Sequence, residues 1–232
     1  MNDQVAYYNQ FGQLYKESIL ACPEPHLWTT DYNEQGRVYH EMRERIVQQQ
    51  QLIEKYFDKA EPVLDIGCGF GRQAYWLAVN GYKVTGTDTS NVFIDIANAL
   101  FEKNKLKGAF VCTDILDDNK LTGTYRQLLL FDVLEHISSN KRRQFFERLH
   151  ALSSEAATLI ISLPHVKKRL SSWVNNNLRR AITQHLSYFL NKEEHPYPIP
   201  NKNSITALSK GLFNVHMFQS TPATDYYILH RI

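Results

Sequence analysis

The sequence has few cysteines and no long apolar run. Its three cysteines, Cys22, Cys68 and Cys112, are odd in number and lack metal-ligand spacing, so we expect a reducing cytoplasmic location, no disulfide framework and no metal site. No apolar stretch approaches about 18 residues, and a membrane-spanning helix is therefore not expected. The first residues lack the basic start and apolar core of a secretory signal.

The composition is that of a globular chain with little net charge. The 232 residues are 43% hydrophobic and carry a formal net charge of +2. A chain of this length can bury a sizeable core as one decorated domain. The balance of charge gives little support to nucleic-acid binding as the main function.

Residues 63–88, VLDIGCGFGRQAYWLAVNGYKVTGTD, hold the most informative pattern. A short apolar run at 63–66 predicts a buried parallel strand. Three glycines follow, at 67, 69 and 71, where the backbone can turn sharply and approach a ligand closely. A helix to about residue 80 and a second strand at 83–87 then lead to Asp88, which is placed to accept hydrogen bonds from two ribose hydroxyls. The pattern predicts a nucleoside-binding α/β unit.

Asp65 narrows the choice of ligand. A carboxylate two residues before Gly67 would repel the pyrophosphate of a dinucleotide. It favours S-adenosylmethionine, which brings an ammonium and a sulfonium group. The glycines also stand as G-x-G-x-G instead of the dinucleotide pattern G-x-G-x-x-G.

With the string LDIGCGFG at 64–71, the sequence resembles the class I S-adenosylmethionine-dependent methyltransferases. Further segments follow in the order of that family over about a hundred residues. A third strand at 108–112 precedes Asp114, a fourth at 127–131 precedes the string DVLEH at 132–136, and a fifth at 157–163 ends at Pro164. In the family an acid at the position of Asp114 contacts the adenine amino group, although Asp114 is also suited to cap a helix.

The resemblance implies an α/β fold, a Rossmann-like three-layer sandwich with a seven-stranded, mostly parallel sheet and an antiparallel final strand. A helical cap is expected at 1–60, followed by the methyltransferase domain at 61–232. We expect S-adenosylmethionine to contact the glycine turn and the residues after the strands. The predicted cofactor-binding residues are Asp65, Gly67, Cys68, Gly69, Gly71, Asp88, Thr89, Asp114, Ile115, Asp132 and Val133.

The N-terminal region predicts two helices. Apolar residues recur at helical spacing between 5 and 19 and between 38 and 57. Four glutamines at 48–51 are expected to form a solvated helix surface. In the resembling family such helices often wall the substrate pocket, and the predicted substrate-binding residues are Tyr8, Trp28 and, before the last helix, His195. The tyrosines are also suited to a purely structural place in the core.

Residues 165–192 form a basic amphipathic insertion after the fifth strand. They contain six lysines and arginines and no acid. Three interpretations remain open: a lid on its own domain, a basic face for an anionic acceptor or an anionic membrane surface, and a nucleic-acid surface, which is the least favoured. The sequence does not indicate an oligomeric state.

His136 is the candidate catalytic residue. An imidazole can take the proton from a hydroxyl acceptor at neutral pH, but Glu135 and His136 are equally suited to brace the next helix, and a carboxylate or phosphate acceptor needs no base. No Pro-Pro-Tyr string follows the fourth strand, which favours an oxygen acceptor over a planar nitrogen.

Three hypotheses for the function remain. The first is a methyltransferase for an oxygen of a small-molecule, lipid-linked or saccharide acceptor. The second is a protein or RNA methyltransferase that docks through the insertion. The third is a regulatory protein that binds S-adenosylmethionine without catalysis.

Overall fold

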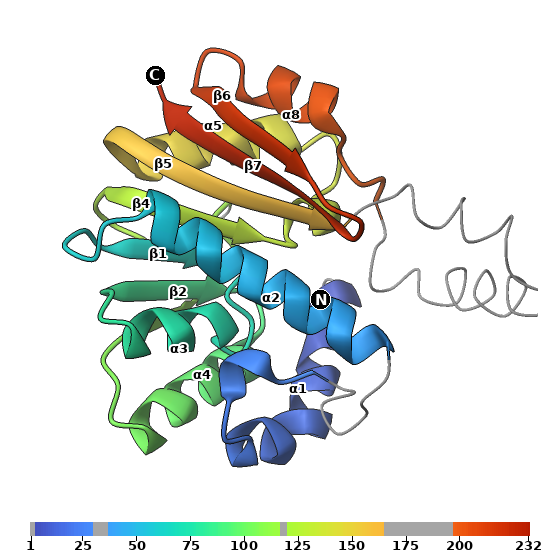
Figure 1. Ribbon diagram of the computed structural model, residues 1–232, viewed down its shortest axis with the longest axis vertical. Helices are drawn as coiled ribbons and strands as arrows, with labels where there is room; N and C mark the ends of the chain where they lie inside the picture. Colours follow the sequence, from blue (N-terminus) through green and yellow to red (C-terminus); the bar gives the residue numbers. More distant parts are fainter. Residues whose placement is uncertain (1–2, 30–36, 117–119, 165–196) are drawn as a thin grey trace, which may run out of the picture.

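The computed structural model describes residues 3–29, 37–116, 120–164 and 197–232 (Figure 1). Seven strands form one sheet in the order β3-β2-β1-β4-β5-β7-β6. The predicted insertion at 165–192 and His195 lie outside the described residues. The elements are α1 (Asp3–Ala21), η1 (Pro25–Leu27), α2 (Arg37–Tyr56), β1 (Val63–Ile66), α3 (Arg72–Val79), β2 (Val84–Asp88), α4 (Asn91–Lys103), β3 (Ala109–Cys112), β4 (Tyr125–Phe131), η2 (Leu134–His136), α5 (Arg142–Leu152), β5 (Ser153–Pro164), α8 (Lys202–Ser209), β6 (Phe213–Ser220) and β7 (Thr224–Arg231).

The sheet is parallel from β3 to β5 and reversed only at β7. The pairs β1–β2, β1–β4, β2–β3 and β4–β5 are parallel, whereas β7 runs antiparallel to both β5 and β6. The prediction of a mostly parallel seven-stranded sheet with an antiparallel final strand is confirmed. Because β1 lies between β2 and β4, the strand order reverses beside it, and open α/β sheets bind ligands at such a point.

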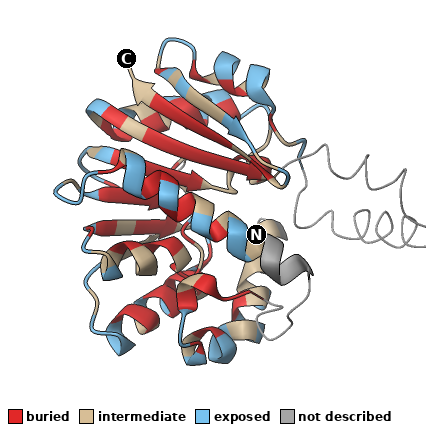
Figure 2. Cartoon of the chain, viewed as in Figure 1, coloured by how far each residue is buried: buried red, intermediate tan, exposed pale blue. Residues whose placement is uncertain are grey.

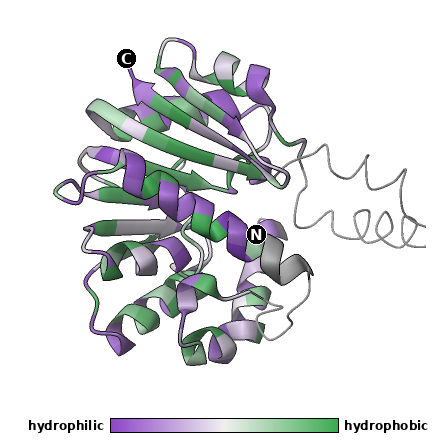
Figure 3. Ribbon diagram, in the orientation of Figure 1, coloured by the Kyte–Doolittle hydropathy of each residue, from purple (hydrophilic) through white to green (hydrophobic). Residues whose placement is uncertain are grey.

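Helices cover both faces of the sheet. Adjacent residues of a strand point to opposite faces, and here both faces are apolar: Leu64 and Leu128 pack with α5 and α8, whereas Val63 and Leu129 pack with α2 and α3. The central strands are therefore buried along most of their length (Figure 2). In the ribbon coloured by hydropathy, β5 is mostly hydrophobic, whereas hydrophilic and hydrophobic residues alternate along the outer helices (Figure 3).

The N-terminal helices pack directly on this sandwich. In α1, a Cβ atom on Gly12 would lie 2.8 Å from Cγ1 of Val92, so glycine permits the close approach of α1 to α4. In α2, Ile53 belongs to the same buried cluster as Val63 of β1. Both predicted helices are present, and the division of the chain at residue 60 stays a prediction.

The glutamines of α2 correct one expectation from the sequence. Gln49 and Gln50 are 4% and 8% exposed, so this part of the helix is not a solvated surface. Gln49 donates to Oγ of Ser162 at 3.1 Å and accepts from Nε2 of Gln73 at 2.7 Å. These hydrogen bonds explain how an amide is accommodated against the sheet.

Within the described part of the chain, no helix combines the length and hydrophobicity that crossing a membrane requires.

Gly86 of β2 gives a test of the packing. A Cβ atom there would lie 2.7 Å from the Phe110 ring and 2.9 Å from Sγ of Cys68. We expect Gly86→Val to lower the free energy of unfolding by about 1 to 3 kcal/mol, because overpacking forces neighbours to shift. Urea unfolding measures this change. Thr85→Val, which keeps a β-branched residue in the same strand, is the control, and equal stability of the two variants would contradict the packing argument.

Candidate active site

The glycine turn after β1 forms the floor of the site. The amides of Gly67 and Cys68 both donate to the carbonyl of Thr87, at 2.8 and 3.0 Å, which fixes the turn against the end of β2. Gly67 has φ 68°, and a Cβ atom there would lie 2.4 Å from the side chain of Val133. Above Gly69, with φ 54°, the nearest atom to a Cβ is 3.9 Å away. The turn is therefore closed on the side of β4 and open above Gly69.

Asp88 joins the two loops that border this opening. One carboxylate oxygen accepts the amide of Gly69 at 2.9 Å, and the other accepts the amide of Ser90 at 2.8 Å. Burial raises the pKa of Asp88, and the hydrogen bonds from the backbone oppose that shift. Each oxygen keeps acceptor capacity for a ligand hydroxyl.

Asp65 is a buried carboxylate without a full set of partners. It is 3% exposed, and its Oδ2 has no hydrogen-bond partner among the described residues. Burial and then the nearby Asp88 raise its pKa to about 7, while the amide of Ala74 acts in the other direction. A cationic group in the pocket would favour the ionised form of Asp65, whereas a pyrophosphate would add a third negative group.

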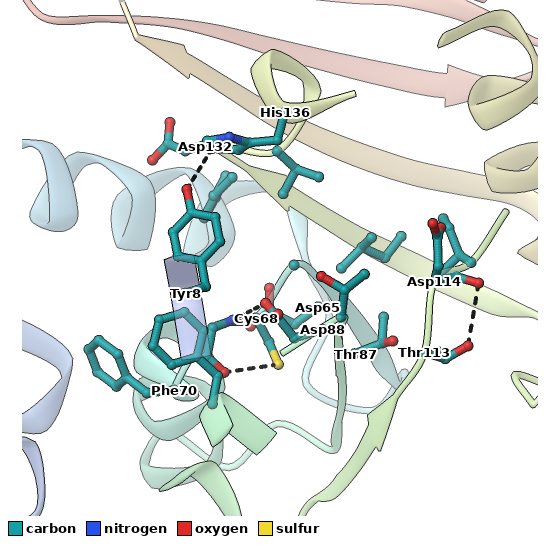
Figure 4. Close-up of a pocket in the computed structure, with 18 of the residues that line it drawn as sticks. Tyr8, Asp65, Cys68, Phe70, Thr87, Asp88, Thr113, Asp114, Asp132 and His136 are labelled. Atoms are coloured by element: carbon teal, nitrogen blue, oxygen red, sulfur yellow. Dashed lines mark hydrogen bonds between the residues drawn. The ribbon is translucent and has the colours of Figure 1, made fainter. Parts of the chain in front are cut away.

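These residues line a cavity of about 370 Å³ at the carboxyl ends of β1, β2 and β4. Figure 4 shows Asp65, Asp88 and Thr87 in the middle of the pocket, with Tyr8 and His136 at one end and Asp114 at the other. One carboxylate oxygen of Asp114 accepts the amide N–H of Leu116 at 3.0 Å. Asp114 therefore stabilises the local backbone turn and also lines the pocket. The predicted residues that line the pocket are Asp65, Gly67, Cys68, Gly69, Asp88, Thr89, Asp114, Ile115, Asp132, Val133, Tyr8 and His136.

Two predicted residues lie elsewhere. Gly71 does not line the pocket; a Cβ atom there would lie 3.1 Å from that of Ala97, so this glycine brings α3 close to α4. Trp28 is 2% exposed and packs behind the pocket against Phe70, with its indole N–H donating to Ser18. Their roles in binding stay predictions.

Asp132 is held by side chains from two other elements. It has φ 57° at the end of β4, forms an ion pair with Arg45 of α2, and accepts from Oγ of Ser162 at 3.0 Å. Its carboxylate therefore orients the segment that leads to His136.

The sequence alone did not point to several lining residues. Gln49 and Gln73 form a buried chain of hydrogen bonds with Ser162 and Asp132, and no local pattern in the sequence links these four positions. Arg72 also lines the pocket; its Nη2 donates to the carbonyl of Trp28 at 2.8 Å. Burial and then the nearby Arg45 lower the pKa of Arg72 to about 10. Arg72 directly follows the last glycine of the turn, so its position in the sequence already indicated that it lies near the pocket.

The family described as "Methyltransferase domain" matches residues 63–155, which run from β1 to the start of β5. This part of the chain therefore matches a methyltransferase domain. The predicted resemblance to methyltransferases and the predicted fold are thus confirmed.

Solved structures share the fold of this methyltransferase domain. Magnesium protoporphyrin IX methyltransferase from Synechocystis PCC 6803, solved with S-adenosylhomocysteine (SAH), has a TM-score of 0.65 at 18% identity, over 100% of both chains. The N-methyltransferase NodS from Bradyrhizobium japonicum WM9, also with SAH, has a TM-score of 0.61 at 15% identity, over 95% of this chain and 98% of the other.

Curated relatives match part of the chain. Ubiquinone biosynthesis O-methyltransferase of Coxiella burnetii is 34% identical over 84 residues, which are 36% of either chain. The protein of the same name from Rickettsia typhi is 28% identical over 148 residues, or 62% of this chain and 58% of the relative. The chain therefore spans between about a third and three fifths of the length of these relatives.

The residues of the methyltransferase domain fit S-adenosylmethionine. The partly unsatisfied carboxylate of Asp65 suits its positive charge, the open face of Gly69 admits it closely, and Asp88 keeps acceptor capacity for its ribose. When bound, this cofactor supplies an electrophilic methyl group. Among the described residues no group of three or more histidine, cysteine or acidic side chains is placed to hold a metal ion.

The raised pKa of Asp65 predicts a pH dependence of stability. Between pH values of about 4 and 7 the folded protein retains a proton that the unfolded chain releases, so the free energy of unfolding falls as the pH rises through this window. Asp65→Asn should remove this contribution. Urea unfolding of both proteins without cofactor at pH 5 and pH 8 measures it, and a wild-type stability advantage that grows with pH would contradict the sign.

The place of Asp88 predicts its effect on cofactor affinity. We expect Asp88→Ala to weaken binding of SAH about 10- to 100-fold, because hydrogen bonds to a charged group contribute about 1.5 to 3 kcal/mol. Calorimetry measures the affinity, and Asp95→Ala, an exposed acid on the adjacent α4, should leave it unchanged. Full affinity in Asp88→Ala, or tighter binding of NAD by the wild type, would be incompatible with the assignment.

Proposed function

We propose that this protein transfers the methyl group of S-adenosylmethionine to an oxygen atom of a small or lipid-linked acceptor, with His136 as the base. The supporting observation is the position of His136, which lines the same cavity as the glycine turn and Asp88. The donor and the acceptor can therefore meet inside one pocket. Positioning of this kind can lower the activation barrier of a bimolecular step by about 7 to 11 kcal/mol.

An oxygen acceptor agrees with two further facts. The curated relatives from Coxiella burnetii and Rickettsia typhi carry the name O-methyltransferase. In addition, His136 Nε2 lies 3.3 Å from the phenolic oxygen of Tyr8, so an oxygen atom already stands at hydrogen-bonding distance from the ring. An acceptor hydroxyl that takes the place of the Tyr8 oxygen, beside an Nε2 lone pair, would pass its proton to His136 as the methyl group is transferred.

The nature of the rest of the acceptor follows from the walls of the pocket. Phe93, Phe131, Ile137 and Phe145 supply apolar surface, while Gln49, Gln73 and Arg72 supply polar groups. This mixture suits an aromatic or lipid-linked molecule with a polar or anionic substituent. The proposed contacts of residues 165–192 with such an acceptor or with a membrane surface concern a segment outside the described residues, as does the predicted role of His195. We propose the cytoplasm as the location.

His136→Gln tests the role of the base. With a panel of phenols, catechols, aliphatic alcohols, glycosides, carboxylic acids and amines, we expect formation of SAH from hydroxyl acceptors to fall by about 10²- to 10⁴-fold, the usual contribution of a general base. The affinity for SAH should remain. The matched control is His150→Gln, on α5 outside the pocket. Unchanged turnover of a hydroxyl acceptor would rule out His136 as the base, and methylation of nitrogen acceptors only would rule out the proposed reaction.

A further inference from the structure

Helix α1 contacts both ring nitrogens of His136. Nε2 of Gln4 lies 3.1 Å from Nδ1, and the hydroxyl of Tyr8 lies 3.3 Å from Nε2. Gln4 and Tyr8 are four residues apart and therefore share one face of the helix. The ring of Tyr8 meets that of His136 edge-on, with the centroids 5.7 Å apart (Figure 4). The imidazole is thus held from two sides by one helix.

The place of α1 is fixed by its packing on α4. Gly12 allows the backbone to approach Val92, and the ring of Tyr8 contacts that of Phe93 with centroids 5.8 Å apart. Near the C-terminal end of α1, Ile19 is fully buried in the same cluster as Phe93. Gln4 is therefore presented to His136 by a helix that is anchored over several turns.

The two partners differ in what they demand of the imidazole. A neutral ring carries one N–H and one lone pair, and the partner of one nitrogen decides which nitrogen holds the proton. A tyrosine hydroxyl can donate or accept, so Tyr8 suits either tautomer. A glutamine amide can only donate through its nitrogen and only accept through its oxygen. The two orientations of the Gln4 amide therefore correspond to the two tautomers of His136, so the orientation of this amide and the tautomer are coupled.

We propose that Gln4 is a positioning residue that sets the orientation and the tautomer of His136. With the amide nitrogen toward Nδ1, as placed here, the ring proton lies on Nε2 and points to the oxygen of Tyr8. With the amide turned by half a rotation, its oxygen accepts the N–H of Nδ1, and Nε2 presents its lone pair to a hydroxyl. The second arrangement is the one that proton transfer requires, and this part rests on the proposed function.

The acidic groups described on the segment of His136 have arginines beside them. On its own segment Asp132 is paired with Arg45, and Glu135 lies near both Arg45 of α2 and Arg142 of α5. From α1 the ring meets the hydroxyl of Tyr8. A carboxylate at position 4 would stand directly against Nδ1 and would require a proton on that nitrogen.

The first test reads the ring itself and needs no acceptor. Two-bond ¹H–¹⁵N spectra distinguish the tautomers of the nine histidines, and His136→Gln identifies the signal of His136. In Gln4→Glu we expect the Nδ1–H tautomer and a pKa of His136 higher by about one unit, because a nearby opposite charge favours the protonated ring. The matched control is Gln10→Glu, an exposed position on the same helix. The same spectrum and the same pKa in both variants would overturn the proposal, whatever reaction the protein performs.

The second test reads the effect on turnover. Gln4→Met keeps the length of the side chain and removes the hydrogen bond, so we expect kcat to fall about 10-fold or more while the KM for S-adenosylmethionine stays unchanged. In Gln4→Glu the acid limb of the pH profile of kcat/KM should shift to higher pH, because the pKa of His136 rises. Thermal unfolding checks that α1 remains packed. If Gln4→Met instead raised the KM for the cofactor and lowered the melting temperature with kcat intact, Gln4 would have only a structural role.

Discussion

The two hydrogen bonds that Asp88 accepts organise the whole binding region. They connect the glycine turn after β1 to the loop after β2, through the amides of Gly69 and Ser90. Because these loops lie at the point where the strand order reverses, their spacing determines the mouth of the pocket. A longer side chain would push the turn away, and an apolar one would leave the amides of Gly69 and Ser90 without these acceptors. Position 88 thus requires a short acidic side chain for the structure of the two loops alone, apart from any contact with a ligand.

A second constraint acts on the other side of the glycine turn. The segment after β4 carries Asp132, Val133 and His136, and Arg45 and Ser162 hold its first residue. Val133 closes on Gly67, so the same segment shapes the floor of the pocket and presents the imidazole. The two roles are coupled: movement of this segment would change the space for the donor and the place of the base together.

The sequence predicted those parts of the site that follow strands along the chain. Asp65, the glycines, Asp88 and His136 each come directly at or after a buried strand, and parallel strands bring their carboxyl ends to one edge. Residues whose place depends on tertiary packing were not predictable. Gln49 lies in a run of four glutamines that looks solvated, and only the approach of α2 to β5 and α3 buries it beside Ser162 and Gln73. Trp28 shows the opposite case, since an aromatic residue in a promising loop became part of a buried cluster.

The contact between Gln4 and His136 joins positions 132 residues apart. The hydrogen bonds that close the glycine turn on Thr87 and Asp88, by contrast, involve no residue of α1. Closing so long a loop costs more conformational entropy than forming the local β–α–β units. The contacts around the imidazole therefore depend on a long-range closure of the chain. Loosening of the first helix would break both contacts to the imidazole together, whereas the hydrogen bonds to Asp88 involve no residue of α1, so cofactor binding by itself is an insufficient measure of an oriented base.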